Sequence, residues 1–90
     1  MYKIIMNDKE MHGAKVICKC RTRMSELVDF SEALYYLDGI YDNLTYLERT
    51  GNTKIIYVSR VTDGVIETAF DDCERGNVKR TYKIVKQRKR

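Results

Sequence analysis

Four side chains of this sequence are of the types that bind metal ions: Cys18, Cys20, Cys73 and His12. Structural zinc sites usually begin with two cysteines that have two to four residues between them, whereas only one residue separates Cys18 from Cys20. On a β-strand this spacing places both thiols on the same side. We therefore predict no metal site, and we expect the cysteines to be buried free thiols that pack as small apolar groups.

The sequence also lacks the residue patterns of an enzyme active site. His12 is the sole histidine, and no serine or cysteine near it forms a pattern typical of a nucleophile and its base. The adjacent carboxylates Asp71 and Asp72 are followed by no ligand spacing of a metal-binding loop. Because a glycine-rich phosphate loop is missing as well, we expect a non-catalytic protein without a cofactor.

Basic residues are the main feature with a binding chemistry. After Glu74 the chain has eight basic residues among its last sixteen and no acidic one. Such clusters bind phosphates, because neutralising phosphate charge releases counterions. The alternative is that these residues only keep a sheet soluble and protect its edge. The predicted nucleic-acid or partner-binding residues are Lys15, Lys19, Arg21, Arg75, Lys79, Arg80, Lys83, Lys86, Arg88, Lys89 and Arg90.

Charge is sorted along the chain, although the net charge is only +4. Residues 1–23 carry six basic and two acidic groups, residues 24–50 carry one and six, and residues 51–90 carry ten and five. The acidic segment also contains three tyrosines outside its apolar stripe, Tyr35, Tyr36 and Tyr46. Because tyrosine is enriched in protein interfaces, they are candidates for a protein-binding surface. The alternative is that Tyr35 and Tyr46 cover the edges of the core.

Apolar periodicity predicts a long helix over residues 25–49. Apolar residues recur there at alternating spacings of three and four, which is typical of an amphipathic helix: Leu27, Phe30, Leu34, Leu37, Tyr41 and Leu44. Ser25 is the expected N-cap, with Glu26 and Asp29 in the first turn. Gly51 and Asn52 are expected to end the helix. Because the stripe continues through Gly39, we favour one helix over two.

Strands are expected on both sides of this helix. A two-residue period or β-branched composition predicts them at 2–6, 14–21, 54–61, 65–70 and 78–86. Asp63-Gly64 supplies a two-residue hairpin turn. In the second strand, Val16, Cys18 and Cys20 are assigned to the core. In the last strand, Val78, Tyr82 and Ile84 should face inward and Lys79, Thr81, Lys83 and Val85 outward.

These elements predict an α+β fold. It consists of an antiparallel sheet of about five strands with one long amphipathic helix on one face, in the order ββαβββ. Residues 1–86 should form a single domain, followed by a basic C-terminal tail at 87–90. The initial apolar run is too short for a signal peptide, and no run approaches a membrane span. With an odd number of cysteines, we expect a cytoplasmic protein without membrane contact.

Two functions are compatible with these features. The first is a small, basic, non-catalytic protein that binds nucleic acid or a nucleoprotein complex through a basic strand face and the C-terminal tail. The second is a protein-binding inhibitor or adaptor, for example of the type that phages and other mobile elements use against host defence nucleases. It would use the tyrosine-bearing acidic helix or the basic face. A heptad-like stripe on a helix longer than its sheet also makes a homodimer a hypothesis.

Overall fold

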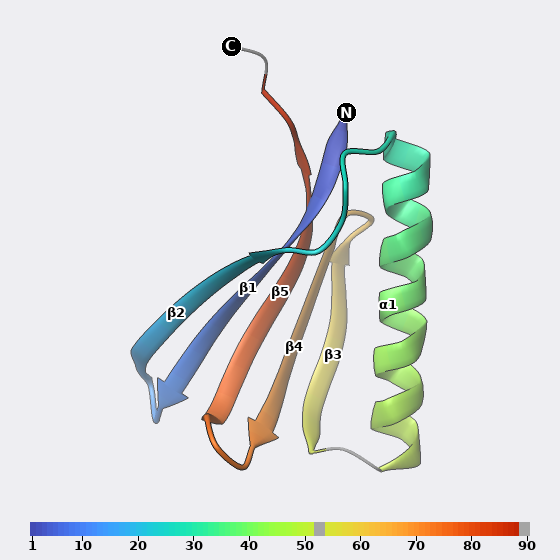
Figure 1. Ribbon diagram of the computed structural model, residues 1–90. Helices are drawn as coiled ribbons and strands as arrows, with labels where there is room; N and C mark the ends of the chain where they lie inside the picture. The colour runs from blue at the N-terminus through green and yellow to red at the C-terminus, as the bar shows by residue number, and fades with distance from the viewer. Residues whose placement is uncertain (52–53, 89–90) are drawn as a thin grey trace.

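The described part of the chain forms five strands and one helix. A computed structural model describes residues 1–51 and 54–88. The elements are β1 (Tyr2–His12), β2 (Lys15–Arg23), α1 (Phe30–Thr50), β3 (Ile55–Thr62), β4 (Val65–Asp72) and β5 (Gly76–Lys86). The strands form one antiparallel sheet in the order β2-β1-β5-β4-β3, and α1 lies along one face of it (Figure 1). The predicted α+β fold and its element order are confirmed.

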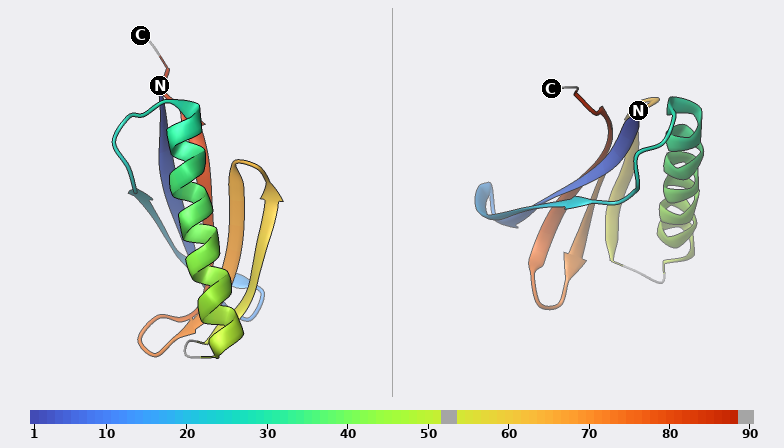
Figure 2. Two further views of the ribbon diagram at one scale, coloured as in Figure 1. Left: turned by 90° about the vertical axis from the view of Figure 1, so that its right-hand side faces the viewer. Right: turned by 45° about the horizontal axis from the view of Figure 1, so that its top comes forward.

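The core lies between α1 and the middle of the sheet. Leu37 of α1 packs against Ile4, Ile66 and Tyr82, which come from β1, β4 and β5. One helix is roughly 10 Å wide, whereas five strands at about 4.8 Å spacing form a wider layer. In Figure 2 the β1–β2 hairpin accordingly extends away from α1. All nine residues of β2 are exposed.

The β1–β2 hairpin differs from the prediction. β1 continues to His12 instead of ending at Met6, and a tight turn with Gly13 at a φ of 61° leads into β2. Val16, Cys18 and Cys20 were assigned to the core, and this assignment is wrong because α1 does not cover β2. The expectation of buried thiols is wrong for Cys18 and Cys20 for the same reason, and it is wrong for Cys73 because this residue lies in the exposed turn between β4 and β5.

The helix begins five residues later than predicted. Asp29 is the N-cap, and its Oδ1 accepts a hydrogen bond of 2.8 Å from the backbone N–H of Glu32. Ser25 instead accepts a hydrogen bond from the backbone N–H of Ile4 through its Oγ, so the chain before α1 is tied to β1. The helix is continuous through Gly39, as predicted, and ends at Gly51 with a φ of 68°. The capping role predicted for Asn52 lies outside the described residues.

The three C-terminal strands follow the predicted pattern closely. The Asp63-Gly64 turn joins β3 to β4, while β4 continues to Asp72 and β5 already begins at Gly76. In β5, Val78 and Tyr82 are buried, whereas Lys79 and Lys83 are exposed. The predicted inward and outward faces of this strand are therefore confirmed. Among residues 1–51 and 54–88, no helix is long and apolar enough to cross a membrane.

Candidate nucleic-acid interface

One face of the sheet is turned away from α1, and we call it the open face. Its residues can be identified from the strand register, because directly opposed residues in an antiparallel pair point to the same side. Lys9 of β1 lies opposite Lys19 of β2 and Lys79 of β5. One row further along, Asn7 lies opposite Arg21 and Thr81, and in the next row Ile5 lies opposite Lys83. Arg23 also lies opposite Ile5, on the same side. Besides Arg23, five exposed basic residues therefore share this face: Lys9, Lys19, Arg21, Lys79 and Lys83.

A shallow hollow lies in the middle of these basic residues. It has a volume of about 510 Å³ and is lined by Asn7, Asp8, Lys9, Lys19, Cys20, Arg21, Thr81 and Lys83. Asn7 and Thr81 are short, whereas the rows on either side contain longer lysines. The hollow thus combines short hydrogen-bonding groups with surrounding positive charge, which is the chemistry that binds a phosphate group.

The five basic side chains are not neutralised by the fold. Within the described part of the chain, none of them forms an ion pair with a carboxylate. Arg23 is the next basic residue along β2, and it is different: its Nε donates a hydrogen bond of 2.8 Å to the backbone oxygen of Ser25, and it pairs with Glu26. We therefore assign to the candidate site only the five unpaired side chains together with Asn7 and Thr81.

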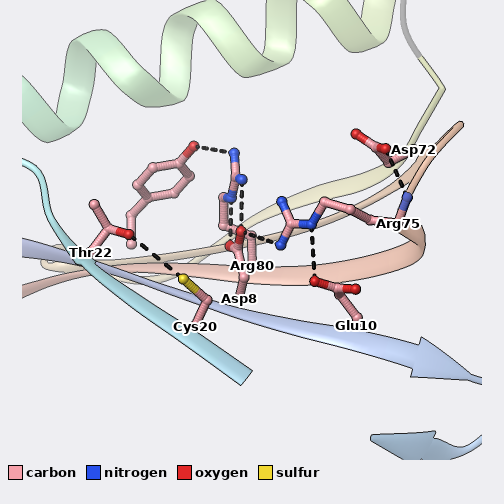
Figure 3. A network of polar contacts seen from close by, with 8 residues as sticks. Asp8, Glu10, Cys20, Thr22, Asp72, Arg75 and Arg80 are labelled. Carbon is pink, nitrogen blue, oxygen red and sulfur yellow. Dashed lines mark hydrogen bonds and ion pairs between the residues drawn. The ribbon is translucent and has the colours of Figure 1, made fainter. Parts of the chain in front are cut away.

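Arg75 and Arg80 occupy a separate place, on the side of the sheet that faces α1. Figure 3 shows Asp8 between these two arginines. Arg80 donates two hydrogen bonds of 2.7 and 2.8 Å to Asp8, and Arg75 donates one of 2.8 Å to Asp8 and one of 3.2 Å to Glu10. Asp8 is only 4% exposed. The guanidinium of Arg80 also lies 4.9 Å from the centre of the Phe70 ring, so this cluster closes one end of the core.

The charges in this cluster stabilise one another. Burial raises the pKa of Asp8, but the hydrogen bonds and charges of Arg80 and Arg75 outweigh it and hold the pKa below its usual value. Hydrogen bonding to Asp8 in turn raises the pKa of Arg80 and of Arg75. Both arginines were predicted to bind a ligand, whereas in the structure their charge is directed to carboxylates of β1. We do not include them in the candidate site.

The other predicted basic residues are scattered. Lys15 lies opposite His12 at the tip of the β1–β2 hairpin, and Lys86 lies opposite Tyr2, on the side of the sheet that faces α1. Arg88 follows β5, and the predicted ligand-binding residues Lys89 and Arg90 lie outside the described residues. The structure thus brings together four of the predicted residues: Lys19, Arg21, Lys79 and Lys83.

Three residues of the candidate site were missed in the sequence: Asn7, Lys9 and Thr81. Asn7 and Lys9 were placed in a loop because β1 was expected to end at Met6. The alternation of Lys3, Ile5, Asn7 and Lys9 with Ile4, Met6 and Asp8 could have extended the strand. Thr81 was predicted to face outward, which its position opposite Asn7 agrees with, but it carries no charge and was not selected as a ligand-binding residue.

The tyrosines of α1 form a second exposed surface. Tyr35, Tyr36 and Tyr46 are 75%, 43% and 53% exposed, so they lie outside the core, as expected. The hydroxyl of Tyr36 donates a hydrogen bond of 3.1 Å to Glu32, and this bond raises the pKa of Tyr36. Tyr35 and Tyr46 lie eleven residues apart, which is close to three helical turns, and therefore point to the same side of the helix.

No protein-family model, curated protein or solved structure matches this chain. Within the described residues, no group of three or more His, Cys, Asp or Glu side chains could hold a metal ion. The candidate site therefore rests on the geometry and charge of the open face.

Proposed function

We propose that this protein binds nucleic acid through the open face of its sheet. The observation that carries the proposal is the group of five unpaired basic side chains around Asn7 and Thr81. Lysine and arginine contacts to phosphates supply most of the affinity of such proteins. The hydroxyl of Thr81 and the side-chain amide of Asn7 add donors of the kind that contact phosphate oxygens.

The distribution of acidic residues supports the same orientation. α1 carries Glu32, Asp38, Asp42 and Glu48 against a single basic residue, Arg49. It lies on the opposite side of the sheet from the open face (Figure 2). Phosphates are repelled by α1 and attracted by the open face, so the charge distribution orients the protein during encounter. The cytoplasmic location expected from the sequence is compatible with this role, because nucleic acids are accessible there.

Two triple variants with the same net charge test the proposal. The open-face variant is K19Q/K79Q/K83Q, and the control variant is K15Q/K54Q/K86Q, whose lysines lie away from the hollow. Affinity for a labelled oligonucleotide is measured at about 50 and 200 mM salt. With five phosphate contacts to a single strand, the logarithm of the affinity should fall with the logarithm of salt with a slope of about −3.5.

The open-face variant retains two of the five contacts, so its slope should be about −1.4. The control variant should keep the slope of the unmodified protein. It also tests the binding role predicted for Lys15 and Lys86. If the two variants lose affinity equally, net charge alone determines binding and the open face is not the site. Absence of binding at low salt refutes nucleic-acid binding altogether.

A second candidate function rests on the tyrosines of α1. Tyr35 and Tyr46 expose large aromatic surfaces on an acidic helix, which fits a basic protein partner of an inhibitor or adaptor. Pull-down from cell extract, with and without nuclease, separates the candidates. Partners that survive nuclease treatment but are lost in Y35A/Y46A favour the second function. A homodimer also stays a prediction, and the mass of the protein in solution tests it.

A further inference from the structure

Among the residues that the structure describes, the open face carries one exposed aromatic ring, that of Tyr57. Tyr57 lies on β3, opposite Ala69 of β4, and is 37% exposed. Ala69 lies opposite Lys79 of β5. Since Lys79 belongs to the open face, Tyr57 belongs to it as well. The ring is thus presented on the same surface as the unpaired lysines.

Tyr57 is at one end of a row that crosses the whole sheet. In the order of the strands, the row consists of Lys19, Lys9, Lys79, Ala69 and Tyr57. Four gaps of about 4.8 Å separate Lys19 from Tyr57, roughly 19 Å in all. Ala69 has no side chain beyond its Cβ, so nothing large stands between Lys79 and the ring. The row places three positive charges at one end and an aromatic ring at the other.

A second hollow connects the ring with the phosphate-binding groups. It has a volume of about 240 Å³, and it is lined by Asn7, Lys9, Tyr57, Glu67, Lys79, Arg80 and Thr81. Asn7, Lys9 and Thr81 line the larger hollow as well. The two hollows therefore adjoin along these three residues, and we call the pair the trough; it extends across the strands from the basic residues of β2 to Tyr57.

We infer that the ligand of the open face is a single-stranded polynucleotide whose backbone lies along this trough and one of whose bases stacks on Tyr57. This inference rests on the proposed function. A base in a duplex is already stacked and paired, so an exposed tyrosine on the surface of the sheet contributes little to duplex binding. An unpaired base has a free π-face, and aromatic side chains bind such bases in single-strand-binding proteins.

Glu67 is an exposed acidic residue of the trough, whereas Asp8, which lines the larger hollow, is buried and paired with Arg75 and Arg80. Glu67 lies opposite Thr81, next to the row that contains Tyr57. Its charge repels phosphates from this end of the trough. The base, which is uncharged, is tolerated there better than the backbone. The phosphates therefore belong at the end with the five unpaired basic residues, and the base belongs at Tyr57.

The test compares three probes of the same sequence, about twelve nucleotides long: single-stranded DNA, single-stranded RNA and duplex DNA. Affinities are measured for the unmodified protein and for Tyr57→Leu, Tyr57→Phe and Tyr46→Ala. Leucine keeps apolar bulk on β3 without a ring, phenylalanine keeps the ring, and Tyr46 is an exposed tyrosine on the opposite side of the molecule. Circular dichroism verifies that each variant is folded.

We expect both single strands to bind more tightly than the duplex. Tyr57→Leu should weaken single-strand binding about tenfold, whereas Tyr57→Phe and Tyr46→Ala should stay within about twofold of the unmodified protein. The inference is overturned if the duplex binds as tightly as the single strands, or if Tyr57→Leu binds them normally. Either result leaves the proposed function intact. Failure of all three probes to bind would instead refute the proposed function. The comparison of DNA with RNA identifies which single strand is preferred.

Discussion

Asp8→Asn should destabilise the protein strongly at neutral pH. Asp8 is 4% exposed and accepts hydrogen bonds from two arginines, which are themselves 31% and 21% exposed in their side chains. Removing one partner of a buried ion pair typically costs about 3–5 kcal/mol. Because Arg75 and Arg80 are partly accessible to water, we expect the lower end, about 3 kcal/mol. For a chain of this length, this corresponds to a decrease in Tm of about 12–24 °C.

The stabilisation by Asp8 should depend on pH. The pKa of Asp8 is lowered in the folded protein, so its contribution to stability is present above the unfolded pKa of about 3.9. It is lost as the pH falls through the folded pKa, where the unmodified protein also carries a neutral side chain at this position. The Tm difference between the protein and Asp8→Asn should therefore be large at pH 7. It should become small at a pH below the pKa that Asp8 has in the folded protein.

Thermal unfolding followed by circular dichroism at several pH values measures this difference. Asp42→Asn is the matched control, since Asp42 is exposed on α1 and the same change there should shift Tm by no more than a few degrees. A small effect of Asp8→Asn at pH 7 would show that the cluster does not stabilise the fold. A difference that stays constant as the pH falls would show that the ionised carboxylate is not the stabilising species.

Three further predictions concern single positions. Gly39→Ala should raise the free energy of unfolding by about 1 kcal/mol, because an added Cβ meets no atom within 4 Å; a lower Tm in thermal unfolding would contradict this. Cys18, Cys20 and Cys73 should all react rapidly with a thiol reagent in the native protein, because all three are exposed; reaction only after unfolding would argue for buried thiols. Glu67→Gln should tighten oligonucleotide binding by up to about fivefold, whereas unchanged or weaker binding in a titration would indicate that Glu67 does not face the ligand's phosphates.

The helix and the last strand could be predicted because their apolar periodicity coincides with their burial. Leu37 lies in the centre of the helical stripe and is fully buried, and Val78 and Tyr82 alternate with exposed lysines on β5. In both elements, one face meets the core and the other meets solvent. A pattern within a short window therefore contains the information that determines the structure.

The second half of β1 could not be predicted in the same way. Asp8 and Glu10 are polar residues in a strand, and their partners Arg75 and Arg80 are more than sixty residues away in the sequence. A local window reads such carboxylates as part of a loop. Because this half of β1 was not predicted, Asn7 and Lys9 were not recognised as strand residues of the open face.

The burial of residues on β2 could not be predicted for a different reason. Alternation identifies Cys18 and Cys20 as residues on one side of the strand, and the register places them opposite Glu10 and Asp8, on the side that faces α1. Alternation does not show how far a helix extends across the sheet. Because α1 is narrower than five strands, this side of β2 is exposed, and the predicted buried residues were wrong.

We propose that the open face, and not α1, binds nucleic acid, and two asparagine side chains distinguish these surfaces. Asn7 lies in the hollow of the open face, whereas Asn43 is exposed on α1. Their side-chain amide signals can be followed separately in ¹⁵N–¹H spectra while a single-stranded oligonucleotide is added. We predict that the Asn7 signal shifts with increasing ligand and that the Asn43 signal stays in place. Shifts of Asn43 with no change of Asn7 would contradict binding at the open face.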